Sequence, residues 1–265
     1  MAINETRRRV VVRDHRVDVA EKKRLLMRTR LLDATMRVFA NSEGAPPVID
    51  DVIREAKVSR GTFYNYFDSL EEVLLVIGQE LSNLMTTEIL PVYDVLKEPW
   101  QRFPVGFRLF LMRAMLDRKW AGFVTRTTAW TEDSLVSQFM SRDLANGVAA
   151  GQFFVDDVQV AADFLKGASA HGIQALRAGV ENPLSYIDCS VRMAMASLGC
   201  DSQRCDEGVA FSASYLKAWV GGELTAGRPQ WALNLNSKEG KEFLASTPLF
   251  SLSPTASEPQ IPSTT

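Results

Sequence analysis

The chain has 265 residues, of which 46% are apolar, and this is ample for a buried core in one or two domains. Its net charge of −2 excludes a protein that is basic over its whole surface. It has only two histidines and three cysteines, and no two cysteines have Cys-x-x-Cys spacing. We therefore expect no metal site, no disulfide framework, no cofactor and no nucleophile–base pair of an enzyme.

The first 19 residues carry repeated charges and contain no apolar run, so they do not resemble a secretory signal. The longest apolar stretches are too short to cross a bilayer. The three cysteines, Cys189, Cys200 and Cys205, fit a reducing compartment. We therefore expect a cytoplasmic protein with no membrane partner.

Charge is divided unevenly along the chain. Residues 1–70 hold 14 Lys and Arg against 10 Asp and Glu, whereas the remainder holds 16 against 22. A basic N-terminal end on an acidic body indicates that one end meets a polyanion. The alternative for the charged, irregular residues 1–20 is a solvated flexible arm that has no partner.

Apolar residues recur at steps of three and four along most of the chain, and no alternating run bounded by hairpin turns is present. The pattern predicts an all-α fold. In the first third, we expect helices at about 21–41, 48–56, 60–66 and 71–90. Ser59 is a good N-cap for the third helix, and Pro91 is expected to end the fourth.

From Trp100 to Ala150 the sequence is rich in aromatic residues and methionine, and it predicts two or three helices. Further helices are expected at about 156–178, 183–198 and 206–220, with Gly179 closing the first of them. Residues 226–265 are rich in Pro, Ser and Thr without a helical period, so a disordered tail is predicted.

Three short helices within about 45 residues, the last two joined by a tight turn, are typical of a helix-turn-helix, here at about 48–67. The second helix of such a pair presents polar side chains to the major groove of DNA, and its inner face stays apolar. Phe63 and Phe67 are four residues apart and would anchor that inner face. The alternative is an ordinary helical hairpin with an exposed aromatic helix.

The stretch from Leu31 to Leu74, which contains the segment VSRGTFYNYF, resembles the N-terminal domain of TetR-family regulators. The family pattern runs from a helix ending in R-x-F-A to a turn of the form A-G-V-S-x-G-T-x-Y-x-Y-F. Matching residues are Asp33, Ala34, Arg37, Phe39, Ala40, Ala56, Val58, Ser59, Gly61, Thr62, Tyr64, Tyr66, Phe67, Ser69 and Glu71. The resemblance implies a sequence-specific, DNA-binding transcriptional regulator.

Carried over by position, the DNA-binding residues that the resemblance implies are Ser59, Arg60, Gly61, Thr62, Tyr64, Asn65 and Tyr66. Tyr64 and Tyr66 correspond to phosphate contacts. Arg60 and Asn65 are candidates for reading base edges. Cations of the arm could follow the DNA backbone or enter a minor groove. They are Arg7, Arg8, Arg9, Arg13 and Arg16.

Four positions depart from the family pattern. Lys57 replaces the usual glycine of the turn and would carry left-handed strain if the turn is kept. Leu70 replaces a lysine that contacts phosphate in the family. Val48 replaces the threonine that usually caps the second helix, so about 1 kcal/mol is lost unless another group substitutes. The glycine after the first helix is shifted to Gly44.

Residues 143–179 resemble the family's helix seven, glycine turn and helix eight. In the family the last long helices pair across a two-fold axis, so the resemblance implies a homodimer that binds a palindromic operator. Small residues that would allow close helix approach are Gly167, Ala168, Ala170 and Gly172. The alternative is that these residues pack within one chain.

The aromatic and methionine-rich block 100–140 corresponds to the family's ligand-binding region, where a pocket would suit an apolar or aromatic effector. The candidate lining is Trp100, Phe103, Phe107, Met115, Trp120, Phe123 and Trp130, with His171 as a polar group of the pocket or the dimer face. For each of these residues the alternative is simple core packing.

The sequence therefore predicts a repressor that a small apolar or aromatic effector releases from DNA. The alternatives are a ligand-independent regulator or activator, and a helical enzyme carrying a helix-turn-helix, against which the missing catalytic constellation argues. The expected organisation is an arm at 1–20, a DNA-binding domain at 21–85, an effector-binding and dimerisation domain at 86–225 and a tail at 226–265.

Overall fold

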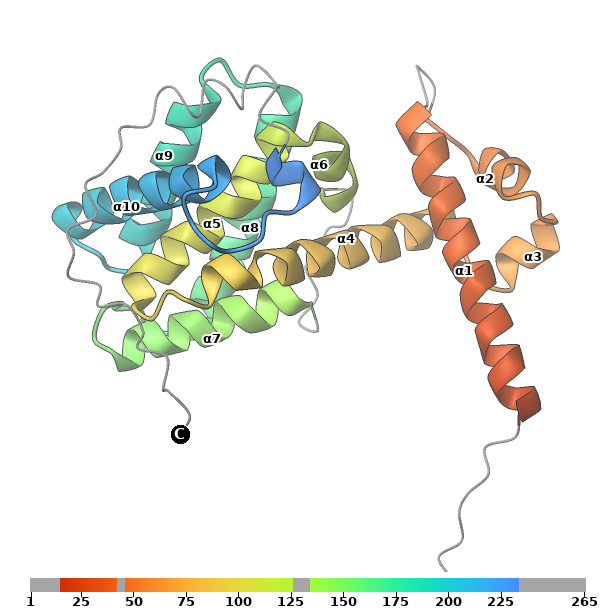
Figure 1. Cartoon of the computed structure of the whole chain (residues 1–265), viewed down its shortest axis with the longest axis horizontal. Coiled ribbons are helices and arrows are strands. Elements are labelled where there is room, and N and C mark those ends of the chain that lie inside the picture. Colours follow the sequence, from red (N-terminus) through yellow and green to blue (C-terminus); the bar gives the residue numbers. More distant parts are fainter. Residues whose placement is uncertain (1–14, 42–45, 126–133, 234–265) are drawn as a thin grey trace, which may run out of the picture. The chain divides into compact units, whose positions relative to one another are not determined.

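The computed structural model describes residues 15–41, 46–125 and 134–233, and its regular elements in these ranges are all helices, as the sequence predicts (Figure 1). They are α1 (His15–Asn41), α2 (Ile49–Ala56), α3 (Arg60–Tyr64), α4 (Leu70–Tyr93), α5 (Pro99–Leu116), α6 (Arg118–Val124), α7 (Leu135–Ala149), α8 (Val158–Ala178), α9 (Pro183–Ser197), α10 (Ser202–Gly221) and the 3-10 helix η1 (Gln230–Leu233).

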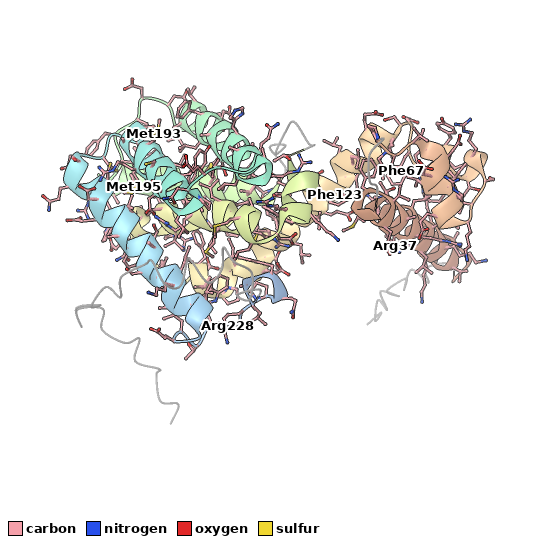
Figure 2. All side chains as sticks on the ribbon, turned by 90° about the horizontal axis from the view of Figure 1, so that it is seen from above. Arg37, Phe67, Phe123, Met193, Met195 and Arg228 are labelled. Atoms are coloured by element: carbon pink, nitrogen blue, oxygen red, sulfur yellow. The ribbon has the colours of Figure 1, made fainter. Side chains whose placement is uncertain are left out.

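The chain divides into two compact units, Met1–Ile77 and Gly78–Thr265. The division falls inside α4, where the sequence interpretation placed the boundary after residue 85. In the N-terminal unit, apolar side chains of α1, α2 and α3 form a small core in which Leu31, Val52 and Phe63 are fully buried. At the edge of this core, Nε of Arg37, labelled in Figure 2, donates to Oε1 of Glu55 at 2.7 Å and joins α1 to α2.

Helix α1 begins at His15, so residues 15–20 are helical and the predicted arm at 1–20 is too long at its C-terminal end. Arg16, assigned to the arm, lies in this helix, whereas the arm cations Arg7, Arg8, Arg9 and Arg13 lie outside the described residues. The segment from His15 contains neither proline nor glycine, and the helix continues without a break into the domain core.

Helix α4 continues past Pro91 to Tyr93, although the sequence interpretation ended it before this proline. Pro91 lacks one backbone donor but its ring φ suits a helix, and the last turn closes with the amide of Asp94 donating to the carbonyl of Leu90 at 2.9 Å. By length and composition α4 is the one described helix that could cross a membrane. Its residues Met85 and Val92 are fully buried among other helices, as in a core helix.

Helix α5 lies at the centre of the C-terminal unit, where α6, α7, α8, α9, α10 and η1 all contact it (Figure 1). Its whole circumference is covered, so that even Arg108 is buried. The Arg108 guanidinium donates to the Ser212 hydroxyl at 2.9 Å and to a carboxylate oxygen of Asp188 at 2.6 Å. These bonds tie α5 to α9 and α10 and satisfy a buried charge.

The segment after α10 belongs to the fold as far as residue 233, so the predicted disordered tail starts too early. Trp231 of η1 is buried and packs edge-on against Trp219 of α10. Its indole N–H donates to Oε2 of Glu88 in α4 at 3.0 Å, and Nη1 of Arg113 donates to the same oxygen at 3.0 Å. The remainder of the predicted tail, 234–265, lies outside the described residues.

Candidate nucleic-acid interface and inner cavity

The turn between α2 and α3 is closed by a lysine in the left-handed region. Lys57 has φ 53° and ψ 49°, and it is the one described non-glycine residue with a positive φ. Its amide donates to the carbonyl of Arg54, and the amide of Val58 donates to that of Ile53. The glycine geometry of the turn is therefore kept, and Lys57 carries the expected strain of roughly 1–2 kcal/mol.

The start of α2 is capped without a hydroxyl group. Val48 stands at the N-cap position and offers no side-chain acceptor. Instead, a carboxylate oxygen of Asp51, three residues on, accepts from the backbone N–H of Val48 at 3.0 Å. This is the reciprocal half of a capping box, and it partly replaces the threonine that the family pattern has here.

Helix α3 begins as the sequence predicts and ends slightly earlier. The Ser59 hydroxyl accepts from the backbone N–H of Thr62 at 3.0 Å, which confirms Ser59 as the N-cap. The helix ends at Tyr64, but the amide of Phe67 still donates to the carbonyl of Phe63 at 3.1 Å. Phe63 and Phe67 are 0% and 3% exposed, so these two rings anchor the inner face as predicted.

The predicted DNA-contacting residues lie together on and just after α3. Most of them are exposed, namely Ser59, Arg60, Gly61, Tyr64 and Asn65, while Thr62 and Tyr66 are half-buried. A methyl group added at Gly61 would meet only Ser59 Oγ, at 3.9 Å, so nothing inside the chain requires glycine there. The missing side chain leaves room for an external partner to approach the backbone.

The polar side chains of this surface are partly paired with one another. Nη2 of Arg60 lies 3.2 Å from Oδ1 of Asp50 in α2. The hydroxyls of Ser59 and Thr62 are 2.8 Å apart. Tyr64 is 46% exposed, and its hydroxyl has no hydrogen-bond partner among the described residues. The surface therefore offers hydroxyl donors and one exchangeable cation to an anionic partner.

The segment that leads from α3 into α4 is fixed by a variant of the capping box, in which Glu72 accepts from the residue before the N-cap. The Ser69 hydroxyl accepts from the amide of Glu72 at 3.1 Å, and a carboxylate oxygen of Glu72 accepts from the amide of Asp68 at 2.6 Å. Leu70, which replaces a lysine of the family pattern, is half-buried and offers no charge at this position.

A cavity of about 50 Å³ lies inside the C-terminal unit, between α4, α5, α7 and α8. Most of its wall is apolar and is made by Ile89, Leu90, Phe103, Gly106, Phe107, Phe110, Val136, Phe139 and Met140. Four polar residues complete the lining: Thr86, Tyr93, Asp143 and Ser169. An apolar wall with a few polar groups is the usual make-up of a small-molecule site.

Tyr93 and Asp143 form the polar corner of this cavity. The Tyr93 hydroxyl donates to Oδ2 of Asp143, and Nε of Arg102 donates to Oδ1 at 3.3 Å. The Arg102 guanidinium also lies over the Tyr93 ring, 4.2 Å from its centre. Burial, followed by the adjacent carboxylate, raises the pKa of Tyr93 well above its ordinary value. Tyr93 therefore remains a neutral donor.

Two of the eight predicted pocket residues, Phe103 and Phe107, line this cavity. The others lie elsewhere: Trp100 packs against Phe211 and beneath Arg204, Trp120 packs against Phe110, and Met115 and Phe123 are buried outside the lining. His171 is exposed on α8, and Trp130 lies outside the described residues.

Helix α7 and the end of α4 contribute lining residues that sequence reasoning missed. Phe139 and Met140 fall in the aromatic block 100–140 and Asp143 begins the segment 143–179, but neither pattern marks them as lining residues. One signal was present, since an aspartate within an aromatic helical region is costly to bury without a partner. The partner, Tyr93, lies 50 residues earlier in the chain, and no local pattern connects the two.

The described residues hold no cluster of three or more His, Cys, Asp or Glu side chains that could bind a metal ion. The described residues present two candidate functional surfaces. One is the polar exposed face of α3, and the other is the apolar cavity with its single acidic corner.

Comparison with known proteins gives matches for both parts of the chain. Residues 31–77 match the family described as bacterial regulatory proteins, tetR family. No curated protein matches the chain significantly.

Several solved structures are similar to the chain. RolR in complex with the ligand resorcinol is 22% identical with a TM-score of 0.60, over 71% of this chain and 95% of RolR. RolR without ligand is 21% identical with a TM-score of 0.57, over 68% and 95% of the two chains. A tetR-family regulatory protein from Rhodococcus RHA1 is 18% identical with a TM-score of 0.47, over 66% and 98%. The likeness to RolR shows a shared fold.

Proposed function

We propose that the chain is a DNA-binding transcriptional regulator of the tetR family, whose model residues 31–77 match, and that it is a homodimeric repressor that a small effector releases from DNA. Members of the family are transcription factors and not enzymes. In this proposal the operator is palindromic, and the effector is apolar or aromatic and binds the cavity beside α4.

The observation that carries the DNA-binding part of the proposal is the anchoring of α3. Phe63 and Phe67 hold one face of this short helix in the domain core, while Arg60, Tyr64 and Asn65 remain exposed on it. A helix held in this way presents polar side chains at fixed positions, as a major groove requires. We assign base reading to Arg60 and Asn65 and phosphate contact to the two tyrosine hydroxyls.

The exposed faces of α8 and α9 support a homodimer. Val160 and Phe164 in α8 and Met193 in α9 are 65%, 62% and 72% exposed, which is unusual for large apolar side chains. Figure 2 labels Met193 and Met195 of α9, the first exposed and the second buried in the core.

Of the small residues predicted to allow close helix approach, Gly167 has no atom within 4 Å of an added methyl group and Ala168 is exposed. Gly172 behaves differently, since a methyl group there would lie 2.8 Å from Leu111 inside the same chain. His171 lies on the exposed stripe of α8 with Phe164 and Gly167, at helical spacing. We propose that this stripe pairs with its copy in a second chain.

The course of α4 supports coupling between the cavity and DNA. Thr86, Ile89, Leu90 and Tyr93 of α4 line the cavity, and the same helix begins at Leu70, directly after the recognition segment. If an effector binds the protein more tightly when α4 is in one of two positions, it shifts the population of molecules toward that position. RolR, which shares the fold, has been solved with resorcinol, an aromatic ligand, and this supports an effector of that class here.

The proposal is tested by footprinting the full chain on genomic fragments, followed by titration of the site in gel-shift assays. The expected site is a palindrome that binds two chains, with an affinity that falls steeply as salt concentration rises. Arg60→Ala should abolish the shift while the circular dichroism spectrum stays unchanged. A non-palindromic site bound by one chain would contradict the homodimer.

A further inference from the structure

The polar groups of the cavity limit which molecules it can bind, and this inference rests on the proposed effector role of the cavity. Thr86 is already satisfied, because its hydroxyl donates to the carbonyl of Ser82 at 3.0 Å. The groups left to meet a ligand are those of Ser169 and of the Tyr93–Asp143 corner.

Ser169 of α8 is the open polar group of the wall. The residue is 2% exposed, and its hydroxyl has no hydrogen-bond partner among the described residues. Two other buried serines are bonded, since Ser212 accepts from Arg108 and Ser137 pairs with Ser134, whereas the buried hydroxyl of Ser82 also has no partner in the described part of the chain. Since buried hydroxyls in native proteins nearly always have a partner, Ser169 is available to a molecule inside the cavity.

The Tyr93–Asp143 corner presents acceptor atoms. The single hydroxyl proton of Tyr93 is used on Asp143, so the phenol oxygen is left as an acceptor beside the carboxylate. Nη1 of Arg102 donates to the backbone carbonyls of Tyr93 and Leu96, and its Nε and Nη2 face Asp143. Arg102 does not line the cavity, and the described lining contains no other cationic side chain. An anion in the cavity would therefore have no cation to pair with.

We propose that the cavity binds a neutral, single-ring phenol, whose hydroxyl group donates to the Tyr93–Asp143 corner and accepts from Ser169 while its ring packs on the phenylalanine wall. The wall consists of Phe103, Phe107, Phe110 and Phe139. Benzoates and phosphate esters are excluded because their charge would be buried without a partner.

The size of the cavity favours a small ligand. Its volume of about 50 Å³ is several times the roughly 10–15 Å³ that one water molecule needs. At the corner, Gly106 lies close to Tyr93, because an added methyl group there would lie 3.0 Å from the Tyr93 ring. Phe139 and Met140 are only half-buried and can shift to admit a ring.

The proposal is tested by isothermal titration calorimetry of the full chain with phenol, toluene and benzoate, which differ in one substituent. Phenol should bind about tenfold more tightly than toluene, the difference that one hydrogen bond provides. Benzoate should not bind. Ser169→Ala should weaken phenol binding severalfold and leave toluene binding unchanged, whereas Ser190→Ala, on α9 outside the lining, should alter neither.

The possible failures are distinguishable. Equal affinity for phenol and toluene, or binding of benzoate, overturns the phenol assignment and leaves an apolar effector site in place. An unchanged phenol affinity in Ser169→Ala, Tyr93→Phe and Asp143→Asn, each checked for native thermal stability, also overturns it. If none of the three probes binds, both the phenol assignment and the proposed effector role of this cavity are wrong, while DNA binding is tested separately by gel shift.

Discussion

The guanidinium of Arg60 and the carboxylate of Asp50 lie 3.2 Å apart, so the first cation of the exposed face of α3, the proposed recognition helix, is already paired. Both side chains are about 60% exposed, and such pairs contribute no more than about 1 kcal/mol. A DNA phosphate or a guanine edge can therefore displace Asp50. In the absence of DNA, Asp50 keeps Arg60 near α2 and places a negative charge beside the exposed face of α3.

We predict that Asp50→Asn increases affinity for DNA of any sequence and reduces discrimination between operator and unrelated DNA. The substitution removes a negative charge next to phosphate and frees Arg60 to pair with it. Affinity for unrelated DNA should rise about three- to tenfold at low salt, and affinity for the operator should rise less. Fluorescence anisotropy titrations with labelled operator and scrambled duplexes measure both.

The matched control is Asp33→Asn, the same charge change at an exposed carboxylate of α1. If both variants raise the two affinities by equal factors, the effect of Asp50 is one of net charge and the pairing with Arg60 has no role in discrimination.

The hydroxyl group of Tyr64 is predicted to contact DNA and to contribute nothing to stability. It has no partner among the described residues, although the ring packs edge-on against Phe63. Tyr64→Phe keeps the ring, so operator affinity should fall about two- to tenfold while the free energy of unfolding stays within about 0.5 kcal/mol. Tyr186→Phe in α9 is the control and should leave operator affinity unchanged.

The local structure around α3 could be predicted in detail because its determinants are local. Ser59 caps a helix that begins one residue later, and Phe63 and Phe67 are one helical turn apart. What the sequence could not show is the replacement of the missing hydroxyl cap by Asp51, or the pairing of Arg60 with Asp50. Both depend on rotamers that spacing alone leaves open.

The cavity could be predicted only as a region. Helix α5 is buried on every side, including at Arg108 and Arg113, so its apolar pattern has no preferred face and does not say which aromatic rings surround a space. Trp120 illustrates this, because it packs beneath Arg113 instead of facing the cavity. The polar corner joins Tyr93 to Asp143 in another helix, and such a long-range contact leaves no periodic signal.

The strained turn at Lys57 offers a stabilising substitution. Glycine adopts φ 53° without the steric cost that a side chain carries. The free energy gained by removing this strain exceeds the stability lost because glycine has more conformational entropy in the unfolded chain. Lys57→Gly should therefore raise the free energy of unfolding by about 0.5–1 kcal/mol in urea denaturation. Lys57→Ala removes the same charge and keeps the strain, so a gain of equal size in the alanine variant would show that strain is not the cause.

The hydrogen bond between Trp231 and Glu88 is predicted to hold the C-terminal segment on α4. Trp231→Phe removes the indole donor from a carboxylate that also binds Arg113, at a cost of about 1.5–3 kcal/mol. Urea denaturation followed by tryptophan fluorescence measures the loss. Trp100→Phe is the comparison, since its half-buried ring packs against Phe211 and makes no bond to Glu88. Equal losses of the free energy of unfolding in the two variants would mean that the smaller ring causes the loss and that the hydrogen bond to Glu88 does not contribute.

Alkaline pH is predicted to destabilise the C-terminal unit through buried tyrosines. Tyr215 donates to the carbonyl of Val92 at 2.8 Å, and burial raises the pKa of its hydroxyl to about 12. The folded chain then keeps a proton that the unfolded chain loses above its ordinary pKa of about 10. The stabilising effect is complete below pH 10 and is lost as the pH rises toward 12, by up to about 1.4 kcal/mol per pH unit.

Tyr215→Phe isolates this effect. The variant should be less stable than the wild type at pH 8, by about 1 kcal/mol for the lost hydrogen bond, and its free energy of unfolding should fall less steeply between pH 10 and 12. Some slope remains, because the pKa of Tyr93 is also raised, and that of Cys200 is raised by burial to about 11. Urea denaturation at each pH gives the two curves. Parallel curves above pH 10 would show that Tyr215 ionises in the folded chain as readily as in the unfolded one.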